Sequence, residues 1–166
     1  MMARAIVAMF VLSVALAGGA YWLWIGNKSD VTFSLLNPEE VSMLVTEEPA
    51  TKPQKKRSLK ISNGNGPGIK VAAPSGFALK SPVDFDIRLE PKDGVAVDMT
   101  SLRIDYRLGP AWVNLTGRIM KQATVEGSRL IARGAELPAG NHTLRLTAKD
   151  ANARTTRATV SFSVTK

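Results

Sequence analysis

The 166-residue sequence has no cysteine and only one histidine, His142. Without a thiol the chain can form neither a disulfide framework nor a thiolate metal site, and it cannot carry a lipid on an N-terminal cysteine. Packing must therefore stabilise whatever folds. A single histidine removes most acid–base and nucleophile–base arrangements of enzymes. We expect no enzymatic activity and no cofactor, and we assign His142 a structural role at a corner of the fold.

Acidic residues are also few, 14 against 22 basic residues, which gives a net charge of +8. Such an excess favours phosphate-rich or carboxylate-rich neighbours, such as lipid head groups, acidic glycans or nucleic acid. The densest basic segment, here called the basic tether, contains Lys52, Lys55, Lys56, Arg57 and Lys60. It can neutralise lipid phosphates or an acidic polymer, or it can simply be a solvated linker. It contains no aromatic residue to stack on bases, so nucleic acid is not the expected partner.

Long apolar runs are confined to the N-terminus, where residues 5–25 carry no formal charge over 21 positions. A helix of this length is about 30 Å long and can span a bilayer. Arg4 precedes the run, and Tyr21, Trp22 and Trp24 lie at its far end, where aromatic rings favour the membrane interface. We therefore predict a signal-anchor helix over residues 1–27 in the cell inner membrane, with the C-terminal domain in the periplasm. The alternative is a signal peptide cleaved after Ala17, which leaves a secreted or periplasmic protein.

Residues 28–68 have the composition of a flexible linker that includes the basic tether. Within it, Asn37 followed by Pro38, Glu39 and Glu40 is typical of a helix start, with an N-cap, a first-turn proline and two carboxylates. A short amphipathic helix on the membrane or on a partner could follow, or only a transient turn. The glycine-rich stretch 63–68 indicates a hinge before a folded domain.

From residue 69 to residue 166 the hydrophobic pattern has a period of two, which predicts half-buried strands. The clearest segment is 83–90, in which Val83, Phe85, Ile87 and Leu89 alternate with charged residues. The same alternation recurs over 102–108, 143–149 and 158–164, and shorter strands are expected at 69–73, 112–115 and 129–132, with a helical turn within 116–124. Turn residues separate these runs. The pattern predicts an all-β fold of two antiparallel sheets packed face to face.

The segment Leu137 to Asp150, followed by a strand that ends Phe162-Ser163-Val164, resembles the last two strands of bacterial immunoglobulin-like and fibronectin type III-like modules. The resemblance covers roughly 100 residues and implies an immunoglobulin-like two-sheet antiparallel sandwich. In the fibronectin type III pattern a tyrosine that anchors a corner often stands where this chain has His142. Families with this fold mostly act in adhesion, spacing or docking.

Three arginines and one tryptophan are the candidate contact residues for a partner or ligand: Arg103, Arg107, Arg145 and Trp112. Trp112 is either an exposed platform on which a sugar stacks or a residue packed between the sheets. The acidic side chains of Asp84, Asp86 and Glu90 share one strand face and are expected to pair with Arg103 and Arg107 rather than to hold calcium.

These features predict a membrane-anchored interaction module that positions other envelope components, for example as an accessory subunit of a membrane protein complex. The alternative hypothesis is a module that binds an anionic glycan or cell-wall polymer through Trp112 and the surface arginines.

Overall fold

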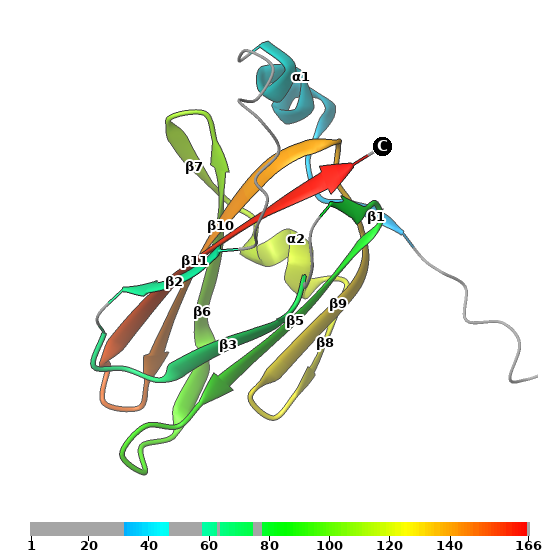
Figure 1. Ribbon diagram of the computed structural model, residues 1–166. Helices are drawn as coiled ribbons and strands as arrows, with labels where there is room; N and C mark the ends of the chain where they lie inside the picture. The colour runs from blue at the N-terminus through cyan, green and yellow to red at the C-terminus, as the bar shows by residue number, and fades with distance from the viewer. Residues whose placement is uncertain (1–31, 47–57, 63, 75–77, 166) are drawn as a thin grey trace, which may run out of the picture. The chain divides into compact units, whose positions relative to one another are not determined.

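A computed structural model describes residues 32–46, 58–62, 64–74 and 78–165, which belong to one compact unit, Val31–Lys166. The chain is mostly β and forms two sheets that pack against each other as a sandwich (Figure 1). The predicted signal anchor, with Arg4, Tyr21, Trp22 and Trp24, lies outside the described residues. So does most of the basic tether, namely Lys52, Lys55, Lys56 and Arg57.

The first sheet, sheet A, has five strands in the order β1-β9-β5-β3, with β8 pairing with β9. Its strands are β1 (Phe33–Ser34), β3 (Gly68–Ala73), β5 (Val83–Glu90), β8 (Ala123–Glu126) and β9 (Arg129–Glu136). All of its pairings are antiparallel except that of β1 with β9.

The second sheet, sheet B, has six strands in the order β2-β11-β10-β6-β7, with β4 pairing in parallel with β11. Its strands are β2 (Ser58–Ser62), β4 (Leu79–Lys80), β6 (Val97–Leu108), β7 (Ala111–Asn114), β10 (Gly140–Asp150) and β11 (Thr155–Thr165). Its centre is the long β10–β11 hairpin, whose register runs from Gly140 opposite Val164 to Lys149 opposite Thr155.

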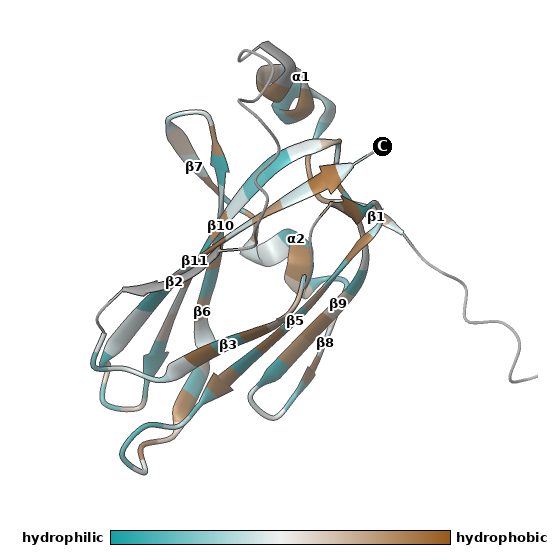
Figure 2. Cartoon of the chain, in the orientation of Figure 1, coloured by the Kyte–Doolittle hydropathy of each residue, from teal (hydrophilic) through white to brown (hydrophobic). Residues whose placement is uncertain are grey.

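The alternating residues predicted from the sequence form the core between the sheets. In β5 every second residue from Val83 to Leu89 is buried, and β6, β10 and β11 follow the same pattern. Brown and teal bands alternate along these strands in Figure 2. Phe85 of sheet A meets Phe162 of sheet B edge to face, with ring centroids 6.4 Å apart. The prediction of a two-sheet all-β sandwich is confirmed.

The folded unit extends further toward the N-terminus than the predicted domain boundary at residue 69. Leu35 and Leu36 have exposed fractions of 0% and 2% and belong to the core. Strand β2 adds to the edge of sheet B, and β1 adds to sheet A. Described parts of the stretch 28–68, predicted as linker, are therefore built into the sandwich, because its few apolar residues pair with strands that lie far away in the sequence.

The predicted hinge 63–68 lies against the sandwich where it is described. At Gly64 and Gly66 the backbone approaches the backbone of Arg154 and Thr155 so closely that a Cβ atom would clash with it. The chain passes here from β2 in sheet B to β3 in sheet A. The glycines therefore serve close packing rather than free rotation.

Of the two alternatives after Asn37, a short helix or a transient turn, the helix forms as α1 (Pro38–Thr46). The Glu40 carboxylate accepts a hydrogen bond from the Asn37 backbone N–H at 2.8 Å, as in a capping box. It also accepts two bonds from Arg118 of the short helix α2 (Thr116–Met120), at 2.6 and 3.1 Å. The hydrogen bond from Arg118 lowers the pKa of Glu40 most, and it outweighs the opposing effect of burial. Since Val41 and Leu44 pack against the core, α1 is part of the folded unit.

Candidate interaction face

The outer surface of sheet B gathers the four contact residues predicted from the sequence. Arg103 and Arg107 alternate along β6 with buried Leu102, Ile104, Tyr106 and Leu108, so they point away from the core. Asp105 lies between them and is the register partner of Arg145 in β10. Arg107 is the register partner of Trp112 in β7. We call the surface formed by Arg103, Asp105, Arg107, Trp112 and Arg145 the arginine face.

Asp105 is the centre of the arginine face, and sequence reasoning did not select it. Its side chain is only 2% exposed because two guanidinium groups cover it. Arg103 donates through Nε to Oδ1 at 2.8 Å, and Arg145 donates through Nε and one terminal nitrogen to Oδ2 at 3.2 and 2.9 Å. Burial alone would raise the pKa of Asp105, but the hydrogen bonds from Arg103 and Arg145 together lower it below its ordinary value. Asp105 therefore stays ionised and orients both arginines.

Trp112 lies on the outer surface, half-buried beneath two arginines. The Arg145 guanidinium carbon lies 4.2 Å from the centre of the indole ring, and that of Arg107 lies at 6.0 Å. Both distances fall within the range of cation–π contacts. The interpretation that places Trp112 between the sheets is wrong, because Trp112 shares the register of outward Arg107. A stacked sugar would have to share the ring with Arg145.

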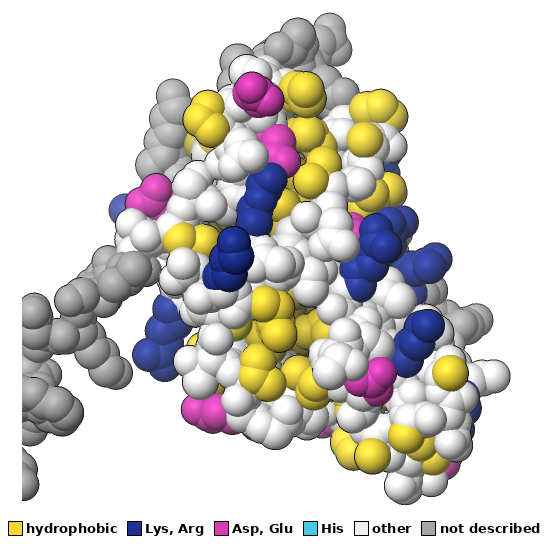
Figure 3. All heavy atoms as spheres, turned by 180° about the vertical axis from the view of Figure 1, so that it is seen from behind, with side chains coloured by type: hydrophobic (Ala, Val, Ile, Leu, Met, Phe, Trp, Pro, Cys, Tyr) yellow, Lys and Arg dark blue, Asp and Glu magenta, His cyan; other side chains and the backbone are white. Residues whose placement is uncertain are grey.

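The arginine face is strongly basic. It contains three guanidinium groups and one carboxylate, which leaves a net charge of +2 on this cluster when Asp105 is ionised. Arg157 of β11 extends the basic surface, since Arg103 and Arg157 are register partners of the same residue, Thr147. Dark-blue basic side chains gather on the right of Figure 3, the flank that carries β6 and β7.

The last residue of the basic tether joins the same sheet. Lys60 lies in β2 and is the register partner of Thr159 in β11. Lys60 thus lies in the edge strand of the sheet that bears the arginine face.

The acidic residues of β5 have partners other than the expected ones. Arg129 of β9 clamps Asp86 with bonds of 2.9 and 2.6 Å, Lys70 of β3 pairs with Glu90 at 2.7 Å, and Asp84 accepts the Gly134 N–H. The hydrogen bond from Arg129 lowers the pKa of Asp86 most. The expected pairing with Arg103 and Arg107 is wrong, because β5 and β6 belong to different sheets.

His142 is buried, and both of its ring nitrogens are engaged. Nε2 donates to the carbonyl oxygen of Pro138 at 2.9 Å, so the unprotonated Nδ1 accepts the hydroxyl of Tyr106 at 2.8 Å. The ring also stacks on Phe162 at a centroid distance of 5.5 Å. Burial lowers the pKa of His142 and raises that of Tyr106 above its ordinary value. The predicted corner role is confirmed, because the bond to Pro138 closes the bend that leads into β10.

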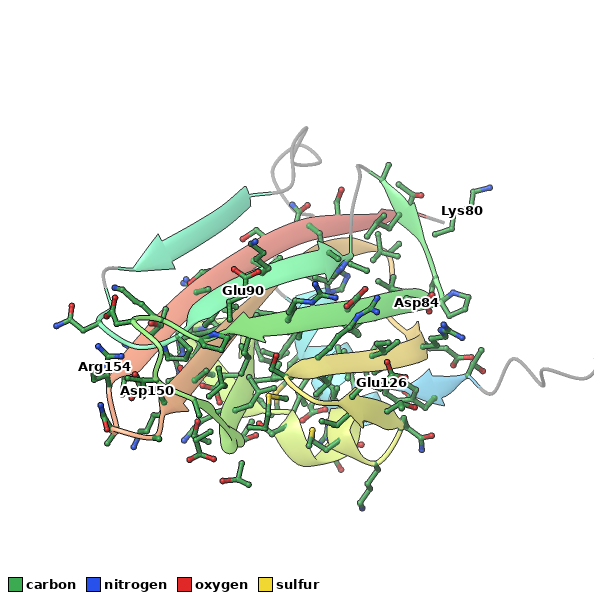
Figure 4. All side chains as sticks on the ribbon, turned by 90° about the horizontal axis from the view of Figure 1, so that it is seen from below. Lys80, Asp84, Glu90, Glu126, Asp150 and Arg154 are labelled. Carbon is green, nitrogen blue, oxygen red and sulfur yellow. The ribbon has the colours of Figure 1, made fainter. Side chains whose placement is uncertain are left out.

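A second polar cluster ties the turns at one end of the sandwich together. Asp150 is 2% exposed and accepts bonds from the backbone of Asn152 and from the backbone and Nε of Arg154. Arg154 also donates to Asp93 and to the carbonyl of Lys92, in the turn region after β5. Asp150 and Arg154 lie side by side in Figure 4. These bonds join the turn between β10 and β11 to the turn region after β5.

A hollow of about 370 Å³ lies beside α1, lined by apolar Leu36, Val41, Pro82 and Leu137 among others. No residue of the arginine face lines it. Among the described residues, no group of three or more histidine or acidic side chains could hold a metal ion.

The chain was compared with models of protein families, with curated proteins and with solved structures. No match was found in any of the three comparisons. The described residues include no helix long and apolar enough to cross a bilayer.

Proposed function

We propose that this protein is a membrane-anchored interaction module without catalytic activity, whose β-sandwich docks an anionic partner outside the cytoplasm. The partner belongs to the membrane or the cell envelope, and the protein acts as an accessory subunit of its complex. The observation that carries the proposal is the arginine face, where Arg103 and Arg145 bind the Asp105 carboxylate and Trp112 contacts Arg107 and Arg145. The apolar run 5–25, preceded by Arg4, supports the anchor.

We further propose that the sandwich is immunoglobulin-like. The order β3-β5-β9-β8 in sheet A matches the A-B-E-D order of that fold, and β11-β10-β6-β7 matches G-F-C-C′. His142 supports this assignment, since its bond to the backbone of Pro138, four residues upstream, resembles the bond made by the corner tyrosine. Fold analogy alone does not give a function, so the docking role rests on the arginine face.

A docking role fits the chemistry of the polar groups better than catalysis does. A general base needs a free lone pair within reach of a substrate proton. The Nδ1 of His142 accepts the Tyr106 hydroxyl inside the core, and both oxygens of Asp105 accept guanidinium hydrogens. Each of these groups holds the fold together or orients a surface arginine.

The test is recovery of the full chain from a detergent extract with whatever copurifies, followed by intact mass. We expect a full-length mass and a stoichiometric protein partner. Replacing Arg103 and Arg107 by Glu should abolish the partner's recovery. Replacing Arg88 and Arg133 of sheet A by Glu is the control with the same change in charge, and it should leave recovery unchanged. Equal recovery with both double variants would refute the docking face, and a mass lacking the N-terminal segment would refute the anchor.

The second candidate function is binding of an anionic glycan or cell-wall polymer. It is favoured by Trp112, whose ring is only half-buried on the outer surface. Retention of the protein on such a polymer, and its loss in Trp112→Ala without a copurifying protein, would favour this function over the first.

A further inference from the structure

The arginine face places its arginines at regularly spaced positions along the strands. Arg103, Asp105 and Arg107 occupy alternate positions of β6, and Arg145 lies opposite Asp105 on β10. The Cα atoms of the three arginines therefore lie on three successive rows, two residues apart. Two residues of a strand advance about 6.6 Å, so the rows repeat at roughly that distance.

The contacts within the face leave hydrogen-bond donors for a ligand. Arg103 uses only Nε in its bond to Asp105, and Arg107 uses only Nε in its bond to the Gly109 carbonyl. Neither residue has a bond from a terminal guanidinium nitrogen to any other residue in the described part of the chain. The Arg103 side chain is 57% exposed. The two outer rows thus each present an accessible pair of terminal nitrogens, the geometry that binds a carboxylate through two parallel bonds.

The same contacts reduce the ordering cost of binding. Asp105 holds Arg103 and Arg145 from below, and Trp112 holds Arg145 from the side. A guanidinium already fixed at Nε loses less rotamer freedom when a ligand binds its terminal nitrogens. Bonds of this kind order the side chains before the partner arrives.

We infer that the arginine face binds an extended acidic segment of the partner protein, with carboxylates on alternate residues. Such a segment places its acidic side chains on one side at about 6.8 Å, which matches the rows of the face. Carboxylate complements guanidinium in both charge and shape. A stacked sugar fits less well, because Arg145 already lies against the Trp112 ring. This inference rests on the proposed docking function and names the partner's chemistry.

Two fluorescent peptides of equal composition and charge provide the test. One repeats Glu-Ser four times, and the other has four Glu followed by four Ser. Binding to the full-length protein in detergent is measured by fluorescence anisotropy at low and at physiological salt. We expect the alternating peptide to bind about tenfold more tightly than the block peptide, and the ratio to persist at physiological salt. Equal affinities within twofold would overturn the inference, since only net charge would then matter.

Variants locate the binding site. They also separate the effect of the paired guanidinium donors from that of positive charge alone. Arg103→Gln with Arg107→Gln should weaken binding of the alternating peptide at least tenfold, whereas Arg133→Gln on sheet A should not change it. Arg103→Lys keeps the charge but loses the paired donors, so it should reduce the preference for the alternating peptide. Equal weakening by Arg133→Gln would overturn the assignment to this face.

A third probe, inorganic polyphosphate, identifies the source of negative charge. Tight binding of polyphosphate with no binding of either peptide would overturn the acidic segment. If neither peptide binds, yet a protein still copurifies in a manner that depends on Arg103 and Arg107, this inference fails while the docking function stands. If copurification does not depend on these arginines, the proposed docking function is refuted, and with it the inference that rests on it.

Discussion

Replacing Asp105 by Asn removes the charge that holds the arginine face together while keeping the shape of the side chain. The buried carboxylate accepts three hydrogen bonds, one from Arg103 and two from Arg145. The Asn amide keeps one acceptor oxygen and turns a donor toward one of the arginines. Two guanidinium groups then face each other without a counter-charge.

The loss of stability in Asp105→Asn depends on how deeply the charged groups are buried. Removing one partner of a fully buried ion pair costs roughly 3–5 kcal/mol, whereas an exposed pair contributes about 0–1 kcal/mol. Here the carboxylate is buried, but the Arg103 and Arg145 side chains are 57% and 25% exposed, so water can solvate them after the change. We expect Asp105→Asn to lower the free energy of unfolding by about 2 kcal/mol, or Tm by about 7 °C for a domain of this size.

The assay is urea and thermal unfolding of the detergent-solubilised chain, followed by far-UV circular dichroism. Glu126→Gln removes an exposed carboxylate of β8 and should change stability by less than about 0.5 kcal/mol. Because the folded-state pKa of Asp105 is lowered, its contribution is present above the unfolded pKa of about 3.9 and is lost as pH falls through the folded pKa. The gap between the two proteins should therefore be constant near neutral pH and should close in acid. A loss below about 0.5 kcal/mol, or a gap that widens in acid, would refute the reasoning.

Three further outcomes are expected. The folded-state pKa of His142 is lowered, so its contribution to stability is complete above the unfolded pKa of about 6.5 and declines as pH falls below it. The urea midpoint of His142→Phe should therefore depend less on pH between pH 7 and 5 than that of the original protein. An equal pH dependence in both proteins would contradict the neutral ring. Leu35→Ala should cost about 2–5 kcal/mol in urea unfolding, because the side chain is fully buried; a loss under about 1 kcal/mol would mean that this segment is not core. Glu40→Gln should speed hydrogen exchange of the backbone amides of residues 41–44 in α1 with little change in Tm, because it weakens the pairing with Arg118. Glu39→Gln, at an exposed position, should leave these exchange rates unchanged. Equal exchange rates in the two variants would show that the pairing with Arg118 does not hold the helix.

The sequence predicts those elements whose signal is local. Alternation over 83–90 and 143–149 marks one buried and one exposed face, and β5 and β10 follow that pattern. The start of α1 is predicted by Asn37 and Pro38 because capping chemistry involves neighbours along the chain. Turn residues separate the alternating runs, and Asp93 and Gly94, in one such turn after β5, adopt positive φ.

Features that depend on distant partners escape sequence reasoning. Strands β1 and β4 have two residues each, too few to show a period, and they exist because β9 and β11 offer them an edge. Leu35 and Leu36 look like isolated apolar residues of a linker until the sandwich provides a core for them. The pairing of Asp86 with Arg129 follows from strand order, which alternation alone does not give.

The arginine face was predicted in part. Alternation places Arg103 and Arg107 on the outer side of β6, but it marks Asp105 as one more solvated charge. Only the register of β10 against β6 brings Arg145 opposite Asp105, and only the β6–β7 register brings Trp112 beside Arg107. The central role of Asp105 is thus a property of three strands together.

Strand β2 determines where this chain can be shortened. A fragment that begins at residue 69 loses β2, so the edge of β11 that faces away from β10 is left unpaired along residues 157–161. It also loses Leu35 and Leu36 from the interior. An open strand edge beside an emptied core recruits other chains, so such a fragment should self-associate into insoluble material. Soluble preparations of the sandwich therefore need to begin ahead of β1, at or before Val31.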